Sequence, residues 1–257
     1  MKDSASYTDF AWVYDELMDE VPYEKWTDSV HNILLEHNIK DGLVLDLGCG
    51  TGIVTEMLAD LGYDMIGIDL SEDMLEIAQE KKYESNNEIL YLCQDMRSFE
   101  LYGTVRGVVS LCDSINYLLS EEDVLKTFKL VNNYLDPKGI FIFDINTPYK
   151  YKTIIGNTTI AENREDCSFI WDNIYDEESG INEYQLTLFI KDEDERYTKS
   201  LEIHHQKGYS LDTICKLLEK SGMEFLQAFD NDTGFEVNDN TEKYTVIARE
   251  KGKKGGM

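Results

Sequence analysis

The sequence predicts an α/β fold with a largely parallel sheet, on three observations. Short apolar segments, each long enough for a buried strand, alternate along the 257-residue chain with segments whose apolar residues recur at helical spacing. A Gly-rich loop joins the first apolar segment to a helix. The first three apolar segments each end in or beside an acidic residue. Strands that alternate with helices favour a parallel sheet with helices packed on its faces.

Residues 1–36 are expected to form a helical cap of two amphipathic helices, because their apolar residues recur at helical spacing. Aromatic side chains crowd the first of these helices, and Tyr7 and Tyr14 are among them. Two interpretations stay open for this crowding: the rings pack against the sheet, or they close over a bound ligand.

The next segment predicts a strand, a tight loop and the N-terminus of a helix. The strand Leu43–Leu47 carries Asp46, and the loop after it has Gly at every second position: Gly48, Gly50 and Gly52. Glycine permits positive φ and a close approach of the backbone to a ligand, and a helix N-terminus offers free N–H groups. The spacing differs from the G-x-G-x-x-G of dinucleotide-binding proteins. An acid before the first Gly suits an ammonium or a sulfonium better than a pyrophosphate.

Two further apolar segments end in acids. The segment Tyr63–Asp69 places Asp69 where a carboxylate can accept both hydroxyls of a ribose, a feature that NAD-binding proteins share. The segment Ile89–Met96 ends with Asp95 and Met96. Each acid alone could serve as a helix or turn cap, but three acids at successive strand ends favour a common ligand site.

Together, the Gly-rich loop, Asp69 and Asp95 resemble the motifs of class I S-adenosylmethionine (SAM)-dependent methyltransferases. The resemblance implies SAM as cofactor and a seven-stranded Rossmann-like sheet in the order 3-2-1-4-5-7-6, with helices on both faces. In that family the acid that matches Asp95 bonds the adenine amino group, and the next residue packs on the ring. The residues then expected at the cofactor are Tyr7, Asp46, Gly48, Cys49, Gly50, Gly52, Asp69, Leu70, Asp95, Met96 and Cys112.

The first helix resembles that of a bacterial branch of small-molecule methyltransferases, through the pattern Tyr7-x-x-Phe10-Ala11-x-x-Tyr14-Asp15. This branch includes the sugar N,N-dimethyltransferases, whose tyrosine in this helix lies at the active site. The resemblance implies such a position for Tyr14.

A fourth strand, Val105–Cys112, is followed by a loop that the resemblance places at the methyl acceptor. Enzymes that methylate amino groups of nucleic acids carry [N/D/S]-P-P-[Y/F] here, whereas this chain has no proline between Cys112 and Tyr117, which argues against a base as substrate. Asp113 and Asn116 are candidates to bind an acceptor amine, and a plain turn is the alternative for Asp113.

Residues 136–139 predict a turn into a fifth strand, Gly139–Ile145. Residues 150–207 then break the alternation with three β-rich segments, 169–175, 183–189 and 197–205, which predict a small antiparallel insertion. In the enzymes that the chain resembles, such an insertion covers the acceptor pocket.

His204 and His205 end this insertion, and strand alternation puts their rings on opposite faces. At most one of them can face the pocket, and a non-catalytic role stays open for both. The catalytic candidates are therefore Tyr14, Asp113, His204 and His205.

Residues 37–149 and 208–250 are expected to form one SAM-binding domain. Ser210 is a candidate N-cap for a helix over 211–220, and the segments 223–229 and 243–249 predict a closing antiparallel pair. The small, basic tail 251–257 is expected to be disordered.

The composition of the chain limits the classes of partner that it is expected to bind. With 24 basic and 51 acidic residues the net charge is −27, which disfavours nucleic acid and anionic membrane surfaces. No apolar run is long enough to span a membrane, and no signal peptide is visible. The five cysteines are scattered without a C-x-x-C pair, which suits reduced thiols in the cytoplasm and predicts no metal site.

The sequence therefore predicts a SAM-dependent methyltransferase that acts on a small molecule, at nitrogen rather than oxygen. An amine near its pKa can arrive without its proton, whereas a hydroxyl needs a base. Two alternatives stay open: a SAM-binding regulatory protein without catalysis, and an NAD-dependent oxidoreductase. The identity of the acceptor and the oligomeric state are not predicted.

Overall fold

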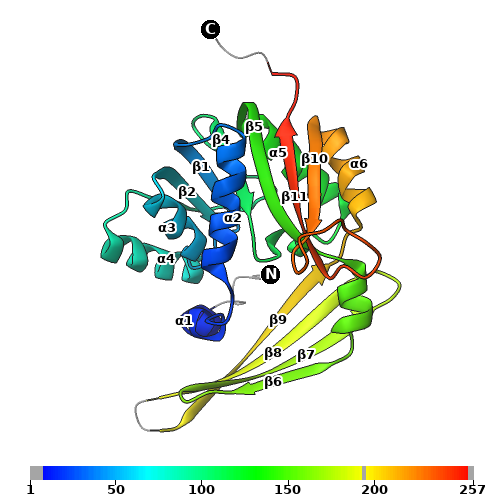
Figure 1. Ribbon diagram of the computed structural model, residues 1–257. Helices are drawn as coiled ribbons and strands as arrows, with labels where there is room; N and C mark the ends of the chain where they lie inside the picture. The colour runs from blue at the N-terminus through cyan, green and yellow to red at the C-terminus, as the bar shows by residue number, and fades with distance from the viewer. Residues whose placement is uncertain (1–7, 193–194, 254–257) are drawn as a thin grey trace.

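A seven-stranded sheet between two layers of helices forms the body of the computed structural model, which describes residues 8–192 and 195–253 (Figure 1). The helices are α1 (Thr8–Leu17), α2 (Tyr23–Glu36), α3 (Ile53–Asp60), α4 (Glu72–Ser85), α5 (Glu121–Tyr134) and α6 (Leu211–Ser221). The strands of this sheet are β1 (Gly42–Leu47), β2 (Tyr63–Asp69), β3 (Leu90–Cys93), β4 (Val105–Ser110), β5 (Leu135–Asn146), β10 (Met223–Asp230) and β11 (Lys243–Glu250).

The strand order confirms the predicted topology. The sheet runs β3-β2-β1-β4-β5-β11-β10, so its sixth and seventh strands along the chain are β10 and β11, as the order 3-2-1-4-5-7-6 requires. The first five strands pair in parallel, and β11 is antiparallel to both of its neighbours. The strand order switches from one side of β1 to the other between β3 and β4, and at such a switch point an open α/β sheet forms a crevice for ligands.

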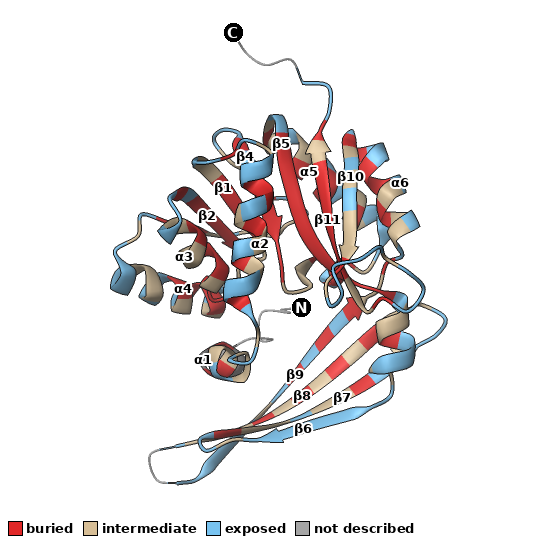
Figure 2. Cartoon of the chain, in the orientation of Figure 1, coloured by how far each residue is buried: buried red, intermediate tan, exposed pale blue. Residues whose placement is uncertain are grey.

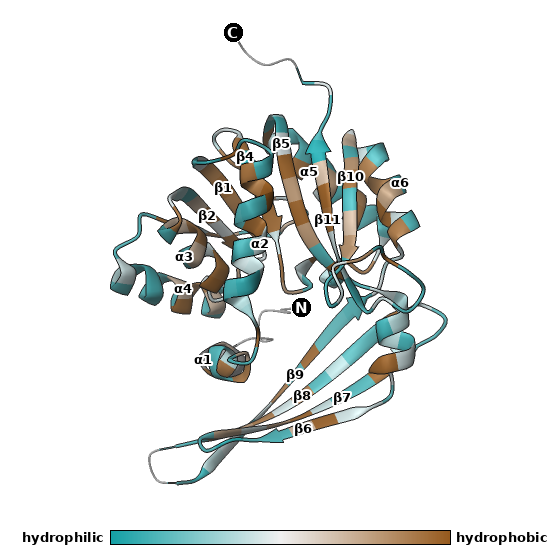
Figure 3. Ribbon diagram, viewed as in Figure 1, coloured by the Kyte–Doolittle hydropathy of each residue, from teal (hydrophilic) through white to brown (hydrophobic). Residues whose placement is uncertain are grey.

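Each face of the sheet has its own hydrophobic core. Helices α5 and α6 pack on one face, through fully buried residues that include Phe128 and Leu218. Helices α2, α3 and α4 pack on the other, through residues that include Leu34 and Leu58. Figure 2 shows the central strands buried, and Figure 3 shows that they are also strongly hydrophobic. This double cover explains why these strands appear in the sequence as continuous apolar runs.

The predicted antiparallel insertion is present as a second sheet of four strands, in the order β6-β7-β8-β9. The strands are β6 (Thr159–Asn163), β7 (Cys167–Asp176), β8 (Ile181–Lys191) and β9 (Tyr197–Lys207). A short π-helix (Lys150–Ile154) leads into it from β5. Strand β6 was missed by the sequence analysis because all five of its residues are exposed, so it lacks the alternation of a half-buried strand.

The turn predicted at 136–139 is not a separate turn, because these residues belong to β5. The pairing of β4 with β5 shifts register between Val105 and Gly107, and Lys138 has a φ of 67°. The N–H of Lys138 donates to the Glu250 carboxylate at 2.9 Å, which holds this irregularity within the strand.

The tail predicted at 251–257 is described only at its start, residues 251–253. Of the tail 251–257, residues 254–257 lie outside the described residues. Lys253 donates through Nζ to the carbonyl oxygens of Asn133 at 2.9 Å and Leu135 at 2.6 Å, at the end of α5. None of the described helices has the length and apolar character needed to cross a membrane.

Gly222 can be used to test whether the left-handed backbone at the end of α6 requires glycine. It ends α6 with a φ of 88°, and an added Cβ would lie 3.0 Å from Nδ2 of Asn132. We expect Gly222→Ala to lower the free energy of unfolding by about 1–2 kcal/mol in urea titration, because an L-residue is strained in this conformation. Gly103→Ala is the control, since its Cβ would meet nothing within 4 Å and should change stability by less than about 0.5 kcal/mol. Equal losses in both variants would contradict the argument.

Candidate functional site

A cavity of about 290 Å³ lies at the carboxyl ends of the parallel strands. The loops after β1 and β4 line one end of it, and residues of β7, β8 and β9 line the other. The helices α1 and α2 contribute a third wall. The cavity thus joins the crevice of the main sheet to the inner face of the second sheet, and the side chains around it are the candidate site.

The Gly-rich loop folds back on the end of β2. The N–H groups of Gly48 and Cys49 donate to the carbonyl oxygen of Ile68 at 2.7 and 3.0 Å. Gly48 has a φ of 82°, and a Cβ there would lie 2.6 Å from the side chain of Ser114, so only glycine fits. A Cβ on Gly50 would meet nothing within 4 Å, because that face of the loop is open.

Two acids, the buried Asp46 and the partly buried Asp69, lie behind this loop and line the cavity. The Asp69 carboxylate accepts the N–H of Gly50 at 2.8 Å and of Ser71 at 2.9 Å, and burial raises its pKa. Asp46 accepts the hydroxyl of Thr55 at 2.6 Å, and burial, with Asp69 nearby, raises its pKa to about 7. A cation in the cavity would stabilise the ionised form of both carboxylates.

The N-terminal helix is fastened to the Gly-rich loop by a contact that the sequence analysis missed. The hydroxyl of Thr51 donates to Asp15 at 2.6 Å, and Lys81 of α4 forms an ion pair with the same carboxylate. Tyr14, for which the resemblance implied a position at the active site, lies in the cavity wall. Burial raises the pKa of Tyr14 well above its usual value, so its phenol stays protonated. Tyr7, also expected at the cofactor, lies outside the described residues.

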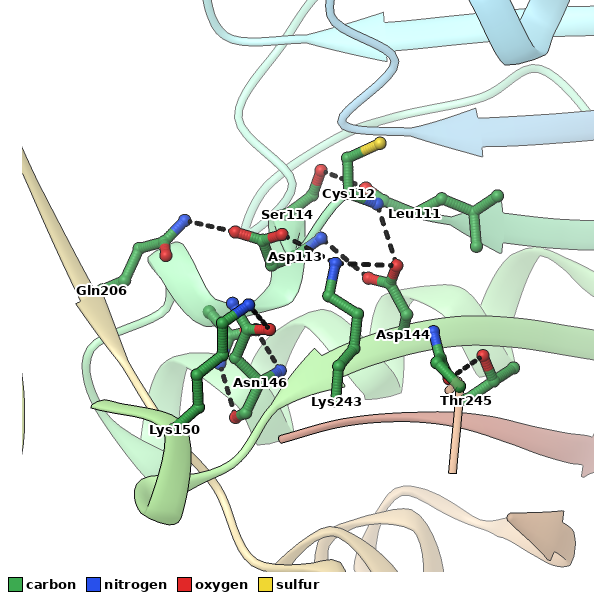
Figure 4. Close-up of polar contacts among 12 residues, drawn as sticks. Leu111, Cys112, Asp113, Ser114, Asp144, Asn146, Lys150, Gln206, Lys243 and Thr245 are labelled. Atoms are coloured by element: carbon green, nitrogen blue, oxygen red, sulfur yellow. Dashed lines mark hydrogen bonds and ion pairs between the residues drawn. The ribbon is translucent and has the colours of Figure 1, made fainter. Parts of the chain in front are cut away.

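The loop after β4 has an unusual backbone that a buried ion pair holds in place (Figure 4). Cys112 and Asp113 have φ values of 57° and 54°, and their N–H groups donate to the Asp144 carboxylate at 3.1 and 2.7 Å. Lys243 of β11 reaches both acids, with Nζ at 2.9 Å from Asp113 and 3.4 Å from Asp144.

The charges of this group balance one another. Burial raises the pKa of Asp113, but the ammonium groups of Lys243 and Lys150 outweigh it and bring the pKa to about 2. Burial lowers the pKa of Lys243, and Asp113 and Asp144 outweigh it in turn, so the net shift is upward. Asp113 is therefore an ionised carboxylate in the cavity wall.

Asn116 is a correction to the sequence analysis, which placed it at the acceptor. Its amide is buried and donates to the carbonyl oxygens of Asn146 at 3.0 Å and Lys207 at 2.7 Å. Its own oxygen accepts the N–H of Asn146 at 2.9 Å. The side chain therefore joins the loop to β5 and to the end of β9.

The two adjacent histidines take opposite faces of β9, as alternation requires. His204 is buried and lines the cavity. His205 is 46% exposed in its side chain and lies 3.1 Å from Glu183 on the outer face, so its position contradicts a catalytic role. Gln206 faces inward again and donates to Asp113 at 3.0 Å, which connects the second sheet to the first.

Four of the expected cofactor residues lie outside the cavity wall: Gly52, Leu70, Asp95 and Met96. Leu70 is 66% exposed at the end of β2. Asp95 accepts both Nε and Nη2 of Arg97, which lowers its pKa. Met96 lies under the Gly-rich loop, with Cε 3.5 Å from where a Cβ of Gly48 would stand. The cavity wall does include the expected Gly48, Cys49, Gly50 and Cys112.

Several cavity residues were not anticipated: Tyr117 after β4, and Phe169, Trp171, Tyr184 and Gln206 from the second sheet. The signal that could have found them is the alternation within each β-rich segment, once its inward face is known. Within the described part of the chain, no cluster of His, Cys, Asp and Glu could hold a metal ion.

Comparison with known proteins also indicates a methyltransferase. The family description "Methyltransferase domain" matches residues 44–139. YqeM of Bacillus subtilis (strain 168), which is named as a methyltransferase, is 37% identical over 219 residues, or 85% of this chain and 86% of that protein.

Solved structures share the fold over nearly the whole chain. An S-adenosylmethionine-dependent methyltransferase from Clostridium acetobutylicum ATCC 824 is similar with a TM-score of 0.87 and 30% identity, covering 96% of this chain and 99% of the other. The sugar N-methyltransferase KedS8 from Streptoalloteichus sp. has a TM-score of 0.76 at 15% identity, covering 96% and 95% of the two chains, and shows a common fold alone.

Lys243 can be tested as the residue that keeps the site charged and folded. We expect Lys243→Met to lower the free energy of unfolding at pH 7 by about 3–5 kcal/mol, because it leaves Asp113 and Asp144 buried without their cation. The measurement is urea unfolding of both proteins from pH 7 to pH 3.

The pH dependence follows from the low pKa of Asp113. Because its folded pKa is about 2, below the usual 3.8, its contribution to wild-type stability is present above about pH 4 and lost as the pH falls through 2. In Lys243→Met, protonation removes the unpaired charges of the two carboxylates as the pH falls. The difference in the free energy of unfolding between wild type and Lys243→Met should therefore become smaller towards pH 3. A difference that is constant with pH would contradict this assignment.

Proposed function

Because this chain belongs to the family of SAM-dependent methyltransferases, we propose that it transfers a methyl group from SAM to a nitrogen atom of a small molecule. The family and the enzyme class are those predicted from the sequence. The position of the SAM site and the chemical class of the methyl acceptor are proposed in addition.

The charge of the cavity wall is the observation that carries the proposal. Asp46, Asp69 and Asp113 line the cavity, and among the described residues that line it none is Lys or Arg. Such a wall favours cationic ligands and disfavours phosphate. SAM carries a sulfonium and an ammonium, and an amine acceptor is a second cation until it loses its proton. Both proposed ligands match this wall.

The residues of the Gly-rich end fit SAM. Asp69 keeps acceptor capacity beyond its two backbone bonds, so it would take the ribose hydroxyls. The open face at Gly50 leaves room for close approach to the backbone, and Asp46 would face the positive end of the ligand. When bound, SAM supplies a methyl group on a sulfonium, whose leaving group is a neutral thioether. The protein then needs only to orient the partners and exclude water, and orientation can supply about 7–11 kcal/mol.

The second sheet would hold the acceptor. Its inward residues Phe169, Trp171 and Tyr184 give the far end of the cavity an aromatic wall, opposite the Gly-rich loop. Aromatic faces attract ammonium groups as well as apolar ones. The carboxylate of Asp113 lies between the two ends and would face the reacting nitrogen.

The proposed enzyme would act in the cytoplasm and would have no nucleic-acid partner. All five cysteines are unbridged, which suits a reducing compartment. The net charge of −27 opposes binding to phosphate backbones.

The deciding experiment is calorimetric titration with SAM, S-adenosylhomocysteine and NADH, followed by a tritiated-methyl screen of amines and hydroxyl compounds. We expect micromolar binding of the first two ligands, no binding of NADH, and label in amines. Label in hydroxyl compounds alone would overturn the nitrogen assignment. Binding of SAM without any transfer would favour a regulatory protein, and preference for NADH would favour an oxidoreductase.

Asp69 gives the sharpest test of the cofactor site. We expect Asp69→Ala to weaken SAM binding about 10- to 100-fold in calorimetry, because hydrogen bonds to a charged group contribute about 1.5–3 kcal/mol. Asp64→Ala is the matched control, since Asp64 lies exposed on the same strand and should bind SAM with wild-type affinity. Unchanged affinity of a folded Asp69→Ala protein would remove the ribose assignment.

A further inference from the structure

Gln206 is a buried amide in the cavity wall with three hydrogen-bond partners. It is the last inward-facing residue of β9 and is 2% exposed. Its Oε1 accepts the hydroxyl hydrogens of Tyr151 at 2.6 Å and Tyr184 at 2.7 Å. Its Nε2 donates to Oδ2 of Asp113 at 3.0 Å. Because a buried polar group costs free energy unless it is hydrogen-bonded, these bonds hold the amide in one place.

The orientation of this amide follows from its neighbours. Lys150 donates through Nζ to Oδ1 of Asn146 at 3.1 Å, which turns Nδ2 of Asn146 to the hydroxyl oxygen of Tyr151 at 3.0 Å. Tyr151 then has its one hydrogen left for Gln206. The Asp113 carboxylate only accepts hydrogen bonds, so the NH2 group of Gln206 must face it. A flipped amide would set its oxygen against a carboxylate.

These bonds form a chain in which every donor points towards Asp113. The chain starts at the ammonium group of Lys150 and passes through Asn146, Tyr151 and Gln206. Aligned hydrogen bonds polarise one another, and a bond to a carboxylate is stronger than a bond between neutral groups. The chain therefore strengthens the contact between Gln206 and Asp113.

Asp113 is held by a different donor at each oxygen. Its Oδ2 accepts Nε2 of Gln206, and its Oδ1 accepts Nζ of Lys243 at 2.9 Å. Figure 4 shows that these donors reach the carboxylate from opposite sides. One donor alone would let the carboxylate rotate about the Cβ–Cγ bond, whereas two donors fix its plane. An ionised carboxylate has about four lone-pair sites. Because Asp113 lines the cavity and its side chain is 26% exposed, it can still accept hydrogen bonds from a ligand.

We propose that Gln206 is a positioning residue, which holds the Asp113 carboxylate in the direction needed to bind the acceptor amine. This inference rests on the proposed function and adds to it a role for the second sheet. Asp113 is the group that would contact the acceptor, and Gln206 acts through Asp113. Tyr184 lines the cavity and bonds the same oxygen of Gln206, so the aromatic wall and the carboxylate are held as one unit.

A second glutamine of the same sheet provides a matched control. Nε2 of Gln185 donates to Oε1 of Glu183 at 2.7 Å, so this amide also bonds a carboxylate. Gln185 alternates with the buried Tyr184 and Leu186 on β8, so it lies on the outer face and outside the cavity wall. The same substitutions can therefore be made at both glutamines.

The first test replaces the amide by an apolar side chain of similar length, and uses an amine found in the tritiated-methyl screen. We expect Gln206→Met to raise the KM for the amine about 10- to 100-fold, because it loses a hydrogen bond to a charged group. The kcat and the Kd for SAM should stay within about threefold of wild type, since the carboxylate holds the amine before and during transfer. Gln185→Met should keep the wild-type KM. A wild-type KM in folded Gln206→Met, or an equal loss of SAM affinity, would overturn the positioning role.

Tyr151 allows the chain of bonds to be tested away from the cavity. It is fully buried and does not line the cavity, so it can act on the acceptor only through Gln206. We expect Tyr151→Phe to raise the KM for the amine about 2- to 10-fold, because the bond that it loses joins neutral groups. An effect larger than that of Gln206→Met would contradict this order of contacts.

The conservative variant Gln206→Glu gives a pH profile that a structural defect would not produce. Burial and the nearby Asp113 carboxylate should raise the pKa of the introduced carboxyl group. Its protonated form can donate to Asp113 in place of the amide, whereas its ionised form repels Asp113. We expect the ratio of its kcat/KM to that of wild type to approach one at about pH 5 and to fall towards about pH 9. The charged groups that act on Asp113 and its neighbour, namely Lys243, Lys150 and Asp144, are common to both proteins. A ratio that is constant with pH would overturn the proposal.

A further readout needs no acceptor. An acid whose pKa is raised in the folded protein contributes its full stability below its unfolded pKa, and that stability is lost as the pH rises through the folded pKa. Gln206→Glu should therefore become less stable relative to wild type between about pH 4 and about pH 9 in urea unfolding. Gln185→Glu should change less, because the side chain of Glu183 beside it is 33% exposed and water screens the repulsion. A pH-independent difference in Gln206→Glu would overturn the contact between Gln206 and Asp113, whether or not the chain transfers a methyl group.

Discussion

The ion pair of Lys243 with Asp113 and Asp144 is the interaction on which the rest of the site depends. The Asp144 carboxylate accepts the N–H groups of Cys112 and Asp113, which both have positive φ. The ammonium group of Lys243 pairs with the carboxylates of Asp144 and Asp113. Gln206 then bonds Asp113 from the second sheet. Since buried charges are stable only when they are paired, loss of the cation would release the loop after β4, which lines the cavity and bonds the second sheet through Asp113.

The fold could be predicted because its signals are local. Each strand of the main sheet is an apolar run, and the glycines and acids at its end lie within a few residues of it. The same is true of the N-cap at Ser210, which the structure contains. The turn at 136–139 was misplaced because residues distant in sequence, such as Glu250, hold the irregular strand there.

Much of the site could not be predicted, because its contacts join distant parts of the chain. Lys243 and Asp113 are 130 positions apart, and Gln206 and Asp113 are 93 apart. No spacing rule relates such residues before the strand order is known. Glu202 is the clearest case: in sequence it is one more acid among 51 acidic residues, and only the fold of β9 shows that it is buried.

The two ends of the cavity are therefore encoded in different ways, and this has a consequence for specificity. The Gly-rich end is built from backbone groups and acids within residues 46–69, so few substitutions there leave it intact. The far end is built from side chains on alternate positions of β7, β8 and β9, such as Trp171 and Tyr184. Those strands are held together by backbone pairing along their whole lengths, with ten and eleven residue pairs between β7 and β8 and between β8 and β9. The end of the cavity proposed to hold the acceptor can therefore be changed one inward position at a time while the end proposed to hold SAM keeps its form.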